Sequence, residues 1–349
     1  MSVTLNSNLI SRKIHMTRLL IVDDCPIFRH MIRSFAEMNG DIKVIGEAVN
    51  GLDAIDMVYQ LSPDILTMDI NMPIMGGLDA IEHIMSSKPL PILVITSRDD
   101  AETAYQAIAK GALEVLPKAN ISSDNYHSFS DKVKLLSKVA VISHIRSKKK
   151  KKLLNLQLAQ SKTDTQIIGI ASSTGGPSAL AHILSELPKH FPVPIVVAQH
   201  LSDGFLPGLI SWLDRVTQLT VKCGENGETL LPGFVYIAPP EKHMIINSSR
   251  QIAYLRRDTS DIYHPSCNQL LKSIGEVYHS QSIGMILTGM GNDGLLGART
   301  IKDQGGFIIA QDEASSAIFG MPQVVINAGY ADKILSLNDM IAYLVNIFC

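Results

Sequence analysis

A Gly-rich turn after an apolar segment presents hydroxyl groups that could act as a nucleophile. The apolar run 167–171 ends at Ser172 and Ser173, and Gly175 and Gly176 follow before a helix-like stretch. A hydroxyl at a strand-to-helix turn lies at the edge of a sheet, beside the free N–H groups of a helix N-terminus. The same turn could instead simply reverse the chain or hold a phosphate group. Periodicity does not choose between the two adjacent serines.

A base and an orienting acid follow two further apolar segments. His200 follows the run 195–199, and Asp293 lies in the loop after the run 283–288. If the runs are parallel strands, their carboxyl ends share one sheet edge with the serine turn. Histidine takes a proton from serine when a carboxylate fixes its tautomer. A lone histidine is more often a structural or surface residue, but three coinciding strand ends favour a Ser–His–Asp triad.

The loop that contains Asp293 also allows a different interpretation. Residues 289–294 read Gly-Met-Gly-Asn-Asp-Gly, which fits the G-x-G-x-x-G pattern of dinucleotide-binding proteins. Asp312 and Glu313 follow at the distance of ~20 residues expected for a ribose-binding acid. Against this, Asp293 would place a carboxylate where a pyrophosphate should bind. The pattern also leaves the serine turn and His200 unexplained.

A second group of chemical side chains occurs in the first half of the chain, again at predicted strand ends. Asp23 and Asp24 end the first apolar segment, Asp69 the third, Thr96 the fourth and Lys118 the fifth. Acidic residues often follow strands, but that tendency does not explain five chemical residues on one edge. Carboxylates so close together would repel one another unless a cation is present.

The oxygen-rich composition of this edge predicts a magnesium site. Mg²⁺ prefers oxygen ligands, which Asp24, Asp69 and the backbone carbonyl of Asn71 could supply. Lys118 and Thr96 could then stabilise a phosphoryl group transferred to the Asp69 carboxylate.

The elements that must position both groups alternate between strand and helix patterns. Such alternation predicts two parallel, doubly wound α/β sheets. In the first half the predicted strands are 19–22, 42–48, 64–68, 92–96 and 113–116, and the predicted helices are 27–38, 51–61, 77–86 and 101–110. In the second half the predicted strands are 167–171, 194–198, 235–238, 283–288 and 306–310, and the predicted helices are 178–187 and 295–303.

Bulk properties agree with two globular domains. The chain has 349 residues, 46% of them hydrophobic, and a net charge of −2, which argues against a general nucleic-acid binder. We expect a disordered extension over 1–16, with Met16 as an alternative start, and a solvated linker over 138–164 that contains the basic run 146–152. The N-terminus does not read as a secretory signal, and no run is long enough to span a membrane.

The cysteines also bear on the compartment. The four cysteines are scattered, without a CxxC motif or metal-ligand spacing, which favours reduced thiols in a cytoplasmic protein.

The stretch 17–133 resembles the receiver domain of bacterial response regulators, which implies a flavodoxin-like fold over 17–137. By that resemblance Asp69 is the phosphoacceptor, Asp23 and Asp24 belong to the metal pocket, and Thr96 and Lys118 are the switch and the anchor. Two positions depart from the family pattern. Val115 stands where an aromatic switch residue is usual, and Ala119 replaces the proline that usually follows the lysine.

The stretch from 165 to about 345 closely resembles the catalytic domain of the CheB family of chemotaxis protein-glutamate methylesterases, which implies a catalytic domain over 165–349. The resemblance rests on the segments 171–176, 199–201, 237–244, 287–294, 311–315 and 319–322. It implies that Ser173, rather than Ser172, is the nucleophile of a triad with His200 and Asp293. It also makes Thr174 and Met290 supporting site residues. Oxyanion donors are expected in the Gly175–Gly176 and Met290 loops. His264 and Asn268 depart from the family, which commonly has arginine and an acidic residue there.

Together the two resemblances imply an enzyme of chemotactic adaptation. We expect it to hydrolyse glutamate methyl esters and to deamidate glutamine on methyl-accepting chemotaxis receptors, under control by phosphorylation from a chemotaxis histidine kinase. Mg²⁺ is expected in the receiver and no cofactor in the catalytic domain. Neither nucleic-acid binding nor direct membrane insertion is expected. Two alternatives stay open: a receiver-controlled dinucleotide-binding enzyme that uses the loop 289–294, and a non-enzymatic signalling module.

Overall fold

The computed structural model describes residues 16–97, 101–122, 126–141, 164–258 and 260–349. The expected extension 1–16, apart from Met16, therefore lies outside the described residues, as does the stretch 142–163 of the expected linker with its basic run. Within the described part, no helix is both long and apolar enough to cross a membrane.

The N-terminal domain is built on a five-stranded sheet in the order β2-β1-β3-β4-β5, and every neighbouring pair is parallel. This is the flavodoxin-like order. The strands are β1 (Thr17–Val22), β2 (Ile42–Ala48), β3 (Ile65–Met68), β4 (Ile92–Thr96) and β5 (Glu114–Pro117).

Helices cover both faces of this sheet because its strands are apolar on both faces. Leu19 and Ile21 pack on the side of α1 and α5, while Leu20 and Val22 pack on the side of α2, α3 and α4. The helices are α1 (Pro26–Glu37), α2 (Gly51–Leu61), α3 (Gly77–Ser87), α4 (Ala101–Ala109) and α5 (Tyr126–Leu136), with a 3-10 turn η2 (Lys118–Asn120) after β5.

The C-terminal domain is built on a seven-stranded sheet in the order β14-β13-β12-β6-β7-β9-β8, again with parallel pairing throughout. Its strands are β6 (Ile167–Ser172), β7 (Ile195–Gln199), β8 (Thr220–Cys223), β9 (Phe234–Ile237), β12 (Ser282–Ile286), β13 (Phe307–Gln311) and β14 (Lys333–Leu335). The strands β10 (Lys242–Ile246) and β11 (Ile252–Arg256) form a separate antiparallel hairpin.

Two layers also enclose the second sheet. On one face lie α6 (Gly176–Leu184), α7 (Leu206–Val216) and α11 (Leu337–Phe348). The other face is covered by the hairpin, α8 (Cys267–Tyr278), α9 (Leu295–Asp303) and α10 (Met321–Asn327). A 3-10 turn η3 (His279–Gln281) leads from α8 into β12.

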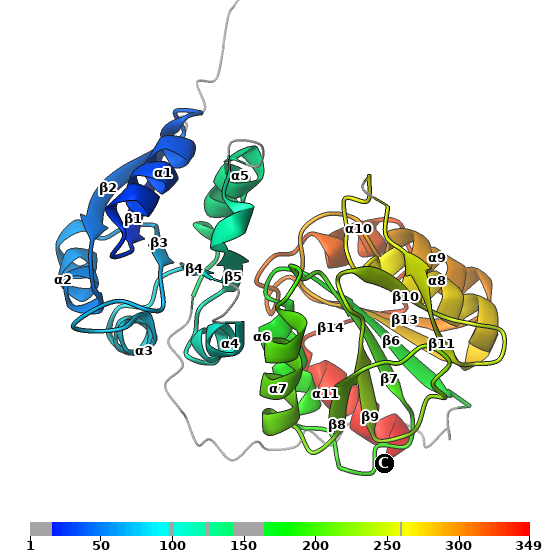
Figure 1. Ribbon diagram of the computed structural model, residues 1–349. Helices are drawn as coiled ribbons and strands as arrows, with labels where there is room; N and C mark the ends of the chain where they lie inside the picture. The colour runs from blue at the N-terminus through cyan, green and yellow to red at the C-terminus, as the bar shows by residue number, and fades with distance from the viewer. Residues whose placement is uncertain (1–15, 98–100, 123–125, 142–163, 259) are drawn as a thin grey trace, which may run out of the picture.

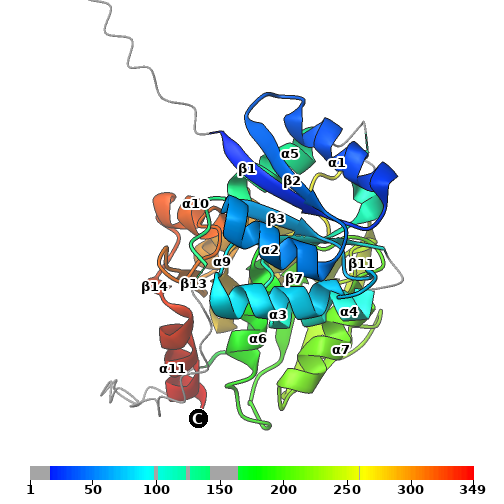
Figure 2. The ribbon, with the colours of Figure 1, turned by 90° about the vertical axis from the view of Figure 1, so that its left-hand side faces the viewer.

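The two domains meet where α4 packs against α6 and α7, an arrangement visible in both ribbon views (Figure 1, Figure 2). Tyr105 of α4 stacks on Trp212 of α7, with ring centroids 5.9 Å apart and planes at 17°. Glu102 of α4 accepts a hydrogen bond from Ser211 (3.3 Å) and pairs with Arg215 (3.7 Å). These contacts join both domains through one continuous apolar core that spans the interface.

Most predicted elements match the structure to within two residues, and the predicted parallel α/β class is confirmed in both halves. The predicted strand 283–288 is shorter, because its last two residues run on towards the loop that holds Asp293. The predicted helix 178–187 begins at Gly176 and ends at Leu184. The strands β8 and β14, the hairpin, and the helices α5, α7, α8, α10 and α11 were not predicted.

Candidate active site

The turn between β6 and α6 distinguishes the two adjacent serines. Ser172 is fully buried, and its hydroxyl donates to Gln199 Oε1 at 2.7 Å. Ser173 is partly exposed, and within the described part of the chain its hydroxyl has no hydrogen-bond partner. Gly176 cannot carry a side chain here, since a Cβ would lie 2.0 Å from Gln199 Oε1. Ser173 is therefore the serine whose hydroxyl is available for chemistry.

Gln199 is a positioning residue that sequence reasoning missed. Its side-chain amide donates to the carbonyl oxygens of Ser173 (2.8 Å) and His200 (2.9 Å). Because Gln199 also accepts a hydrogen bond from Ser172, it connects the end of β6 to the end of β7. The available signal was a polar residue that closes an apolar strand, and it is 2% exposed.

The structure brings His200 and Asp293 together. His200 Nε2 lies 2.8 Å from Asp293 Oδ2, and the carboxylate is almost fully buried. Asp293 also accepts from the backbone N–H groups of Cys267 (2.6 Å) and Asn268 (2.8 Å). Burial alone would raise the pKa of Asp293, but hydrogen bonds from His200 and these two N–H groups outweigh it and hold the pKa below its usual value.

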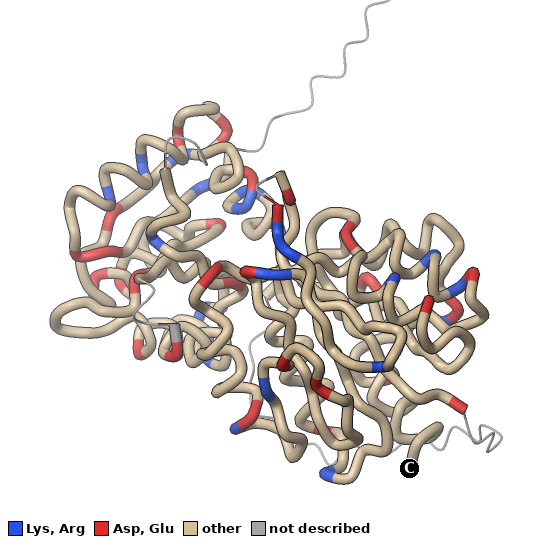
Figure 3. The backbone as a smooth tube through the Cα atoms, turned by 45° about the vertical axis from the view of Figure 1, so that its right-hand side comes forward, with Lys and Arg blue, Asp and Glu red and all other residues tan. Residues whose placement is uncertain are grey.

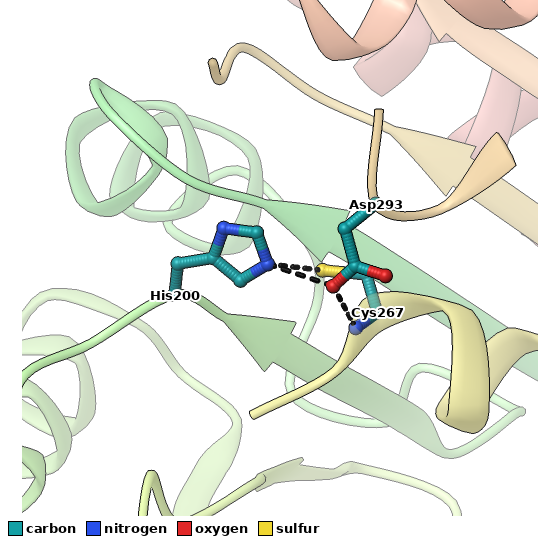
Figure 4. A group of neighbouring side chains, drawn as sticks. All are labelled: His200, Cys267 and Asp293. Carbon is teal, nitrogen blue, oxygen red and sulfur yellow. Dashed lines mark hydrogen bonds and ion pairs between the residues drawn. The ribbon is translucent and has the colours of Figure 1, made fainter. Parts of the chain in front are cut away.

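The imidazole of His200 has a defined orientation. Its ring stacks on Tyr263, with centroids 5.0 Å apart and planes at 15°. Figure 4 shows Nε2 directed at Asp293 and at the thiol of Cys267, whose Sγ lies 3.5 Å away. The other ring nitrogen, Nδ1, lies on the far side of the ring from the carboxylate (Figure 4). With Nε2 bound to the acid, Nδ1 is the nitrogen that remains for proton transfer.

Ser173 and His200 line the same cavity, of about 520 Å³, between the two domains. One wall belongs to the C-terminal domain and includes Gly175 and Tyr263. The opposite wall belongs to the N-terminal domain and comes from α4, β5, η2 and α5. Across it, Asn120 of η2 donates a hydrogen bond to Ser202, two residues after His200, at 3.1 Å. The N-terminal domain thus covers the site.

The four other predicted site residues occupy different positions. Thr174 is buried, and its carbonyl accepts from Thr288 Oγ1 at 3.0 Å. Gly176 donates its N–H to the Ser173 carbonyl at 2.8 Å, while the N–H of Gly175 has no acceptor in the described part. Gly175 lines the cavity, with a φ of +76° at the start of α6. Met290 is exposed and lines a second, smaller cavity instead.

The loop 289–294 does not have the geometry of a dinucleotide site. Asn268 Oδ1 accepts from the N–H groups of Gly294 (2.9 Å) and Gly297 (3.0 Å), so a side chain already occupies the start of α9. The Asp293 carboxylate faces His200 rather than an incoming phosphate. Asn268, one of the departures from the family pattern, thus caps the start of α9 through its amide oxygen.

His264 replaces a permanent cation with a titratable ring at the cavity wall. Burial, followed by the charge of Arg257, holds the pKa of His264 below its usual value. Its Nδ1 is buried without a hydrogen-bond partner. The ring is therefore neutral at neutral pH, and this wall is less positive than the family pattern implies.

The acidic edge of the N-terminal domain forms a compact cluster around Lys118. The carboxylate oxygens of Asp23, Asp24 and Asp69 lie within 4.8 Å of one another. Lys118 Nζ lies 2.7 Å from both Asp23 Oδ2 and Asp69 Oδ2, and 4.7 Å from the ring centroid of Phe28. Burial raises the pKa of Asp69 although Lys118 opposes that shift. Ion pairing raises the pKa of Lys118 despite its burial.

Two further predicted residues border this cluster. Thr96 is fully buried at the end of β4, and Asn71 is exposed in the loop after β3. Val115 lies in β5 and lines the cavity between the domains, and Ala119 lies in η2. The carboxylates of Asp23, Asp24 and Asp69 fit a hard divalent cation such as Mg²⁺.

Fold and sites together define a response regulator in which a receiver is joined to a catalytic domain. A sequence profile described as the response regulator receiver domain matches residues 19–126, and one described as CheB methylesterase matches residues 168–344. The chain belongs to the CheB methylesterase family, and it is an enzyme of the hydrolase class.

Related proteins align with almost the whole length of this chain. A protein-glutamate methylesterase/protein-glutamine glutaminase of Paramagnetospirillum magneticum is 42% identical, over 94% of this chain and 95% of its own. One of Thermotoga maritima is 37% identical, over 91% and 94%. The crystal structure of the CheB methylesterase catalytic domain of Thermotoga maritima superposes with a TM-score of 0.50 and 41% identity, covering 52% of this chain and 98% of that one.

Proposed function

We propose that this enzyme hydrolyses γ-methyl esters of glutamate on methyl-accepting chemotaxis receptors, releasing methanol, and deamidates receptor glutamine. The observation that carries the proposal is the 2.8 Å pair between His200 Nε2 and Asp293 Oδ2, beside a cavity that Ser173 also lines. The names of the relatives supply the substrate class.

The proposed mechanism gives each side chain one task. His200 Nδ1 takes the proton of Ser173, whose oxygen attacks the substrate carbonyl carbon. Asp293 holds the imidazole in the tautomer with Nε2 protonated and stabilises the imidazolium that forms. The imidazolium then gives its proton to the leaving methanol or ammonia. Water, activated by the same nitrogen, releases the glutamate and restores Ser173.

The oxyanion of the tetrahedral intermediate needs donors beside Ser173. The N–H of Gly175 is the favoured donor, because it lines the cavity and the described part supplies no acceptor for it. The N–H of Gly176 is already used within the turn. Each such donor is typically worth a factor of ~10²–10³ in rate.

We further propose that the N-terminal domain regulates access to this site. Asp69 accepts a phosphoryl group from a chemotaxis histidine kinase. Asp23, Asp24, Asp69 and the carbonyl of Asn71 would hold Mg²⁺, which neutralises negative charge on a phosphoryl group when bound. Lys118 and Thr96 contact that group. Phosphorylation adds charge next to η2 and weakens the packing that covers Ser173 and His200.

The location follows from the substrate and the phosphodonor. The enzyme is proposed to act in the cytoplasm, on receptor segments that reach it there, without inserting into the membrane and without binding nucleic acid. Figure 3 shows Lys and Arg interspersed with Asp and Glu on both domains, which supports a protein partner rather than a phosphate backbone.

The test is methanol release from methylated receptors in the presence of a phosphodonor. Ser173→Ala removes the nucleophile, so turnover should fall by a factor of at least ~10⁴. Ser178→Ala, at an exposed position in the first turn of α6, is the matched control and should keep most of the activity. Near-normal turnover by Ser173→Ala would refute the assignment.

A further inference from the structure

The thiol of Cys267 adds a third potential ligand to the His200–Asp293 pair. Its Sγ lies 3.5 Å from His200 Nε2, and one ligand atom from each of the three residues lies within 4.8 Å of the others. The esterase mechanism gives this thiol no task. We propose that His200, Cys267 and Asp293 form a binding site for a soft divalent cation such as Zn²⁺, and that its occupation inhibits the enzyme.

The two distances from His200 Nε2 are close to those of tetrahedral coordination. Zinc bonds of ~2.0–2.3 Å place ligand atoms about 3.3 Å apart for a nitrogen–oxygen pair and about 3.6 Å apart for a nitrogen–sulfur pair. The nitrogen–sulfur pair, His200 Nε2 and Cys267 Sγ, is already at 3.5 Å. The nitrogen–oxygen pair, His200 Nε2 and Asp293 Oδ2, is at 2.8 Å and needs to open by about half an ångström.

The ligands are held in place by contacts of their own. Backbone N–H groups at the start of α8 fix the Asp293 carboxylate, and the Tyr263 ring packs against the His200 imidazole. Cys267 is the first residue of α8 and is fully buried. Such outer contacts raise metal affinity because His200 and Asp293 need little rearrangement, while the Cys267 thiol gives up its hydrogen bond to the Ala198 carbonyl (3.3 Å). His200 borders the cavity, so a water molecule could take the fourth position.

The kind of ligand separates this site from the acidic cluster of the receiver. A set of one imidazole, one thiolate and one carboxylate prefers zinc or another late transition metal. The cluster of Asp23, Asp24 and Asp69 offers only oxygen and prefers Mg²⁺. One chain would thus hold two divalent cations of different chemistry at its two functional sites.

Inhibition follows from the proton balance, and this step rests on the proposed function. In the metal-free pair the single proton of neutral His200 is on Nε2, which leaves Nδ1 free to accept from Ser173. A cation bound at Nε2 moves that proton to Nδ1, and the Cys267 thiol releases its own proton to solvent. Nδ1 then carries hydrogen and cannot accept the proton of Ser173.

The first experiment measures binding without activity. Co²⁺ is added to the full-length protein in excess Mg²⁺, and absorption from thiolate-to-cobalt charge transfer is recorded. A variant with Cys25→Ser, Cys223→Ser and Cys349→Ser keeps only Cys267 and should show the band. Cys267→Ala, which keeps the other three thiols, should lose it. No band in the triple variant would overturn the proposal.

The second experiment measures inhibition relative to the metal-free rate of each variant. Zn²⁺ should inhibit methanol release by the parent enzyme, and a chelator should reverse it. Cys267→Ala and Cys267→Ser should each raise the half-inhibitory Zn²⁺ concentration by at least about tenfold. An unchanged half-inhibitory concentration in both variants would overturn the proposal. If the cobalt band appears but Zn²⁺ does not inhibit an active enzyme, the proposed inhibitory role is wrong. Failure of the esterase assignment is a distinct outcome, because it would appear as near-normal turnover of Ser173→Ala and would leave the cobalt band intact.

Discussion

Asp293 illustrates how a buried carboxylate stays ionised in a catalytic domain. It is 2% exposed, yet three hydrogen bonds, from His200 and two backbone N–H groups, keep its pKa below the usual value. The charge is therefore present throughout the neutral pH range, and Oδ2 lies 2.8 Å from His200 Nε2.

Replacing this carboxylate by an amide should remove most of the activity. In Asp293→Asn the amide can donate to His200 Nε2, which would place the imidazole proton on Nδ1, the nitrogen proposed to accept the serine proton. The expected loss of kcat is about 10⁴-fold, the size seen when a triad carboxylate is replaced by an amide in a serine protease. Methanol release at saturating substrate measures it.

The chain offers a matched control for this substitution. Asp261 forms a similar pair with His243, at 2.8 Å from Nε2, but neither residue lines the cavity. Asp261→Asn should change kcat by no more than a few-fold. A comparable loss in both variants would mean that any weakened His–Asp pair disturbs the fold.

Sequence reasoning could place the site residues at strand ends but not specify their contacts. The positions of Ser173 and His200 follow from parallel strands, whose carboxyl ends share one edge. The contacts of Cys267 and Tyr263 with His200 depend on how a distant segment crosses that edge, and no local pattern encodes this. Which glycine N–H stays free likewise depends on the turn, where Gly176 is used and Gly175 is not.

Among the secondary-structure elements, α1 is connected to β2 by two arginine side chains, and one of them also binds the loop that contains Asp23 and Asp24. Arg29 and Arg33 both pair with Glu47, at 3.1 and 2.8 Å. Arg29 also donates to the carbonyl oxygens of Asp23 and Asp24. The same side chain therefore holds the helix and the backbone of the predicted magnesium loop.

Glu47→Gln should destabilise the protein in a pH-dependent way. Partial burial would raise the pKa of Glu47, but Arg33 and Arg29 outweigh it and lower the pKa below the usual value. A lowered folded-state pKa stabilises above the unfolded-state pKa, and that stabilisation is lost as pH falls through the folded-state pKa. The expected cost near neutral pH is up to about 1 kcal/mol.

Urea titrations followed by circular dichroism measure this difference. The difference in the free energy of unfolding between the parent and Glu47→Gln should be largest near neutral pH and should vanish under acidic conditions. A difference in the free energy of unfolding that stays constant with pH would show that packing, rather than charge, holds α1 in place.

The fold could be predicted at this scale wherever strands are buried on both faces. Strands such as β1, β4 and β6 read as continuous apolar runs between turn residues, and helices such as α2 show clear periodicity. The strands that were missed have weaker signals, whereas the missed helices α7, α8 and α11 are as long as the predicted ones. β14 has three residues, β8 four, and the hairpin β10–β11 lies outside the main sheet, so sheet alternation does not apply to it.

At the scale of the whole molecule, the receiver covers the candidate active site through a contact that combines a shared apolar core with exposed polar pairs. Glu102 pairs with Arg215 at 3.7 Å across the interface, and both side chains are exposed. Exposed pairs contribute little, up to about 1 kcal/mol. Reversing the charge of Glu102 or Arg215 should therefore shift the equilibrium between the state in which the receiver covers the site and a state in which the domains have separated. Neither domain should unfold.

Glu102→Lys places two cations together and should raise unphosphorylated activity by about two- to fivefold. Arg215→Glu should act in the same direction. The double exchange restores opposite charges and should return activity towards the parent value, measured as methanol release without phosphodonor. Additive increases in the double variant would contradict a direct pair.

Asp69→Asn tests the link between phosphorylation and access. The amide cannot form the acyl phosphate, so a phosphodonor should no longer stimulate methanol release, while basal turnover stays within about threefold of the parent. Stimulation that survives in this variant would show that control does not run through Asp69.

The stacked rings at the interface give the molecule an optical property of its own. Trp212 is the single tryptophan in the sequence, and it lies 6% exposed against Tyr105 of the opposite domain. Indole emission moves to longer wavelength when water reaches the ring. Separation of α4 from α7 would therefore change the intrinsic fluorescence of the unlabelled protein, so domain opening can be timed in a stopped-flow instrument independently of catalysis.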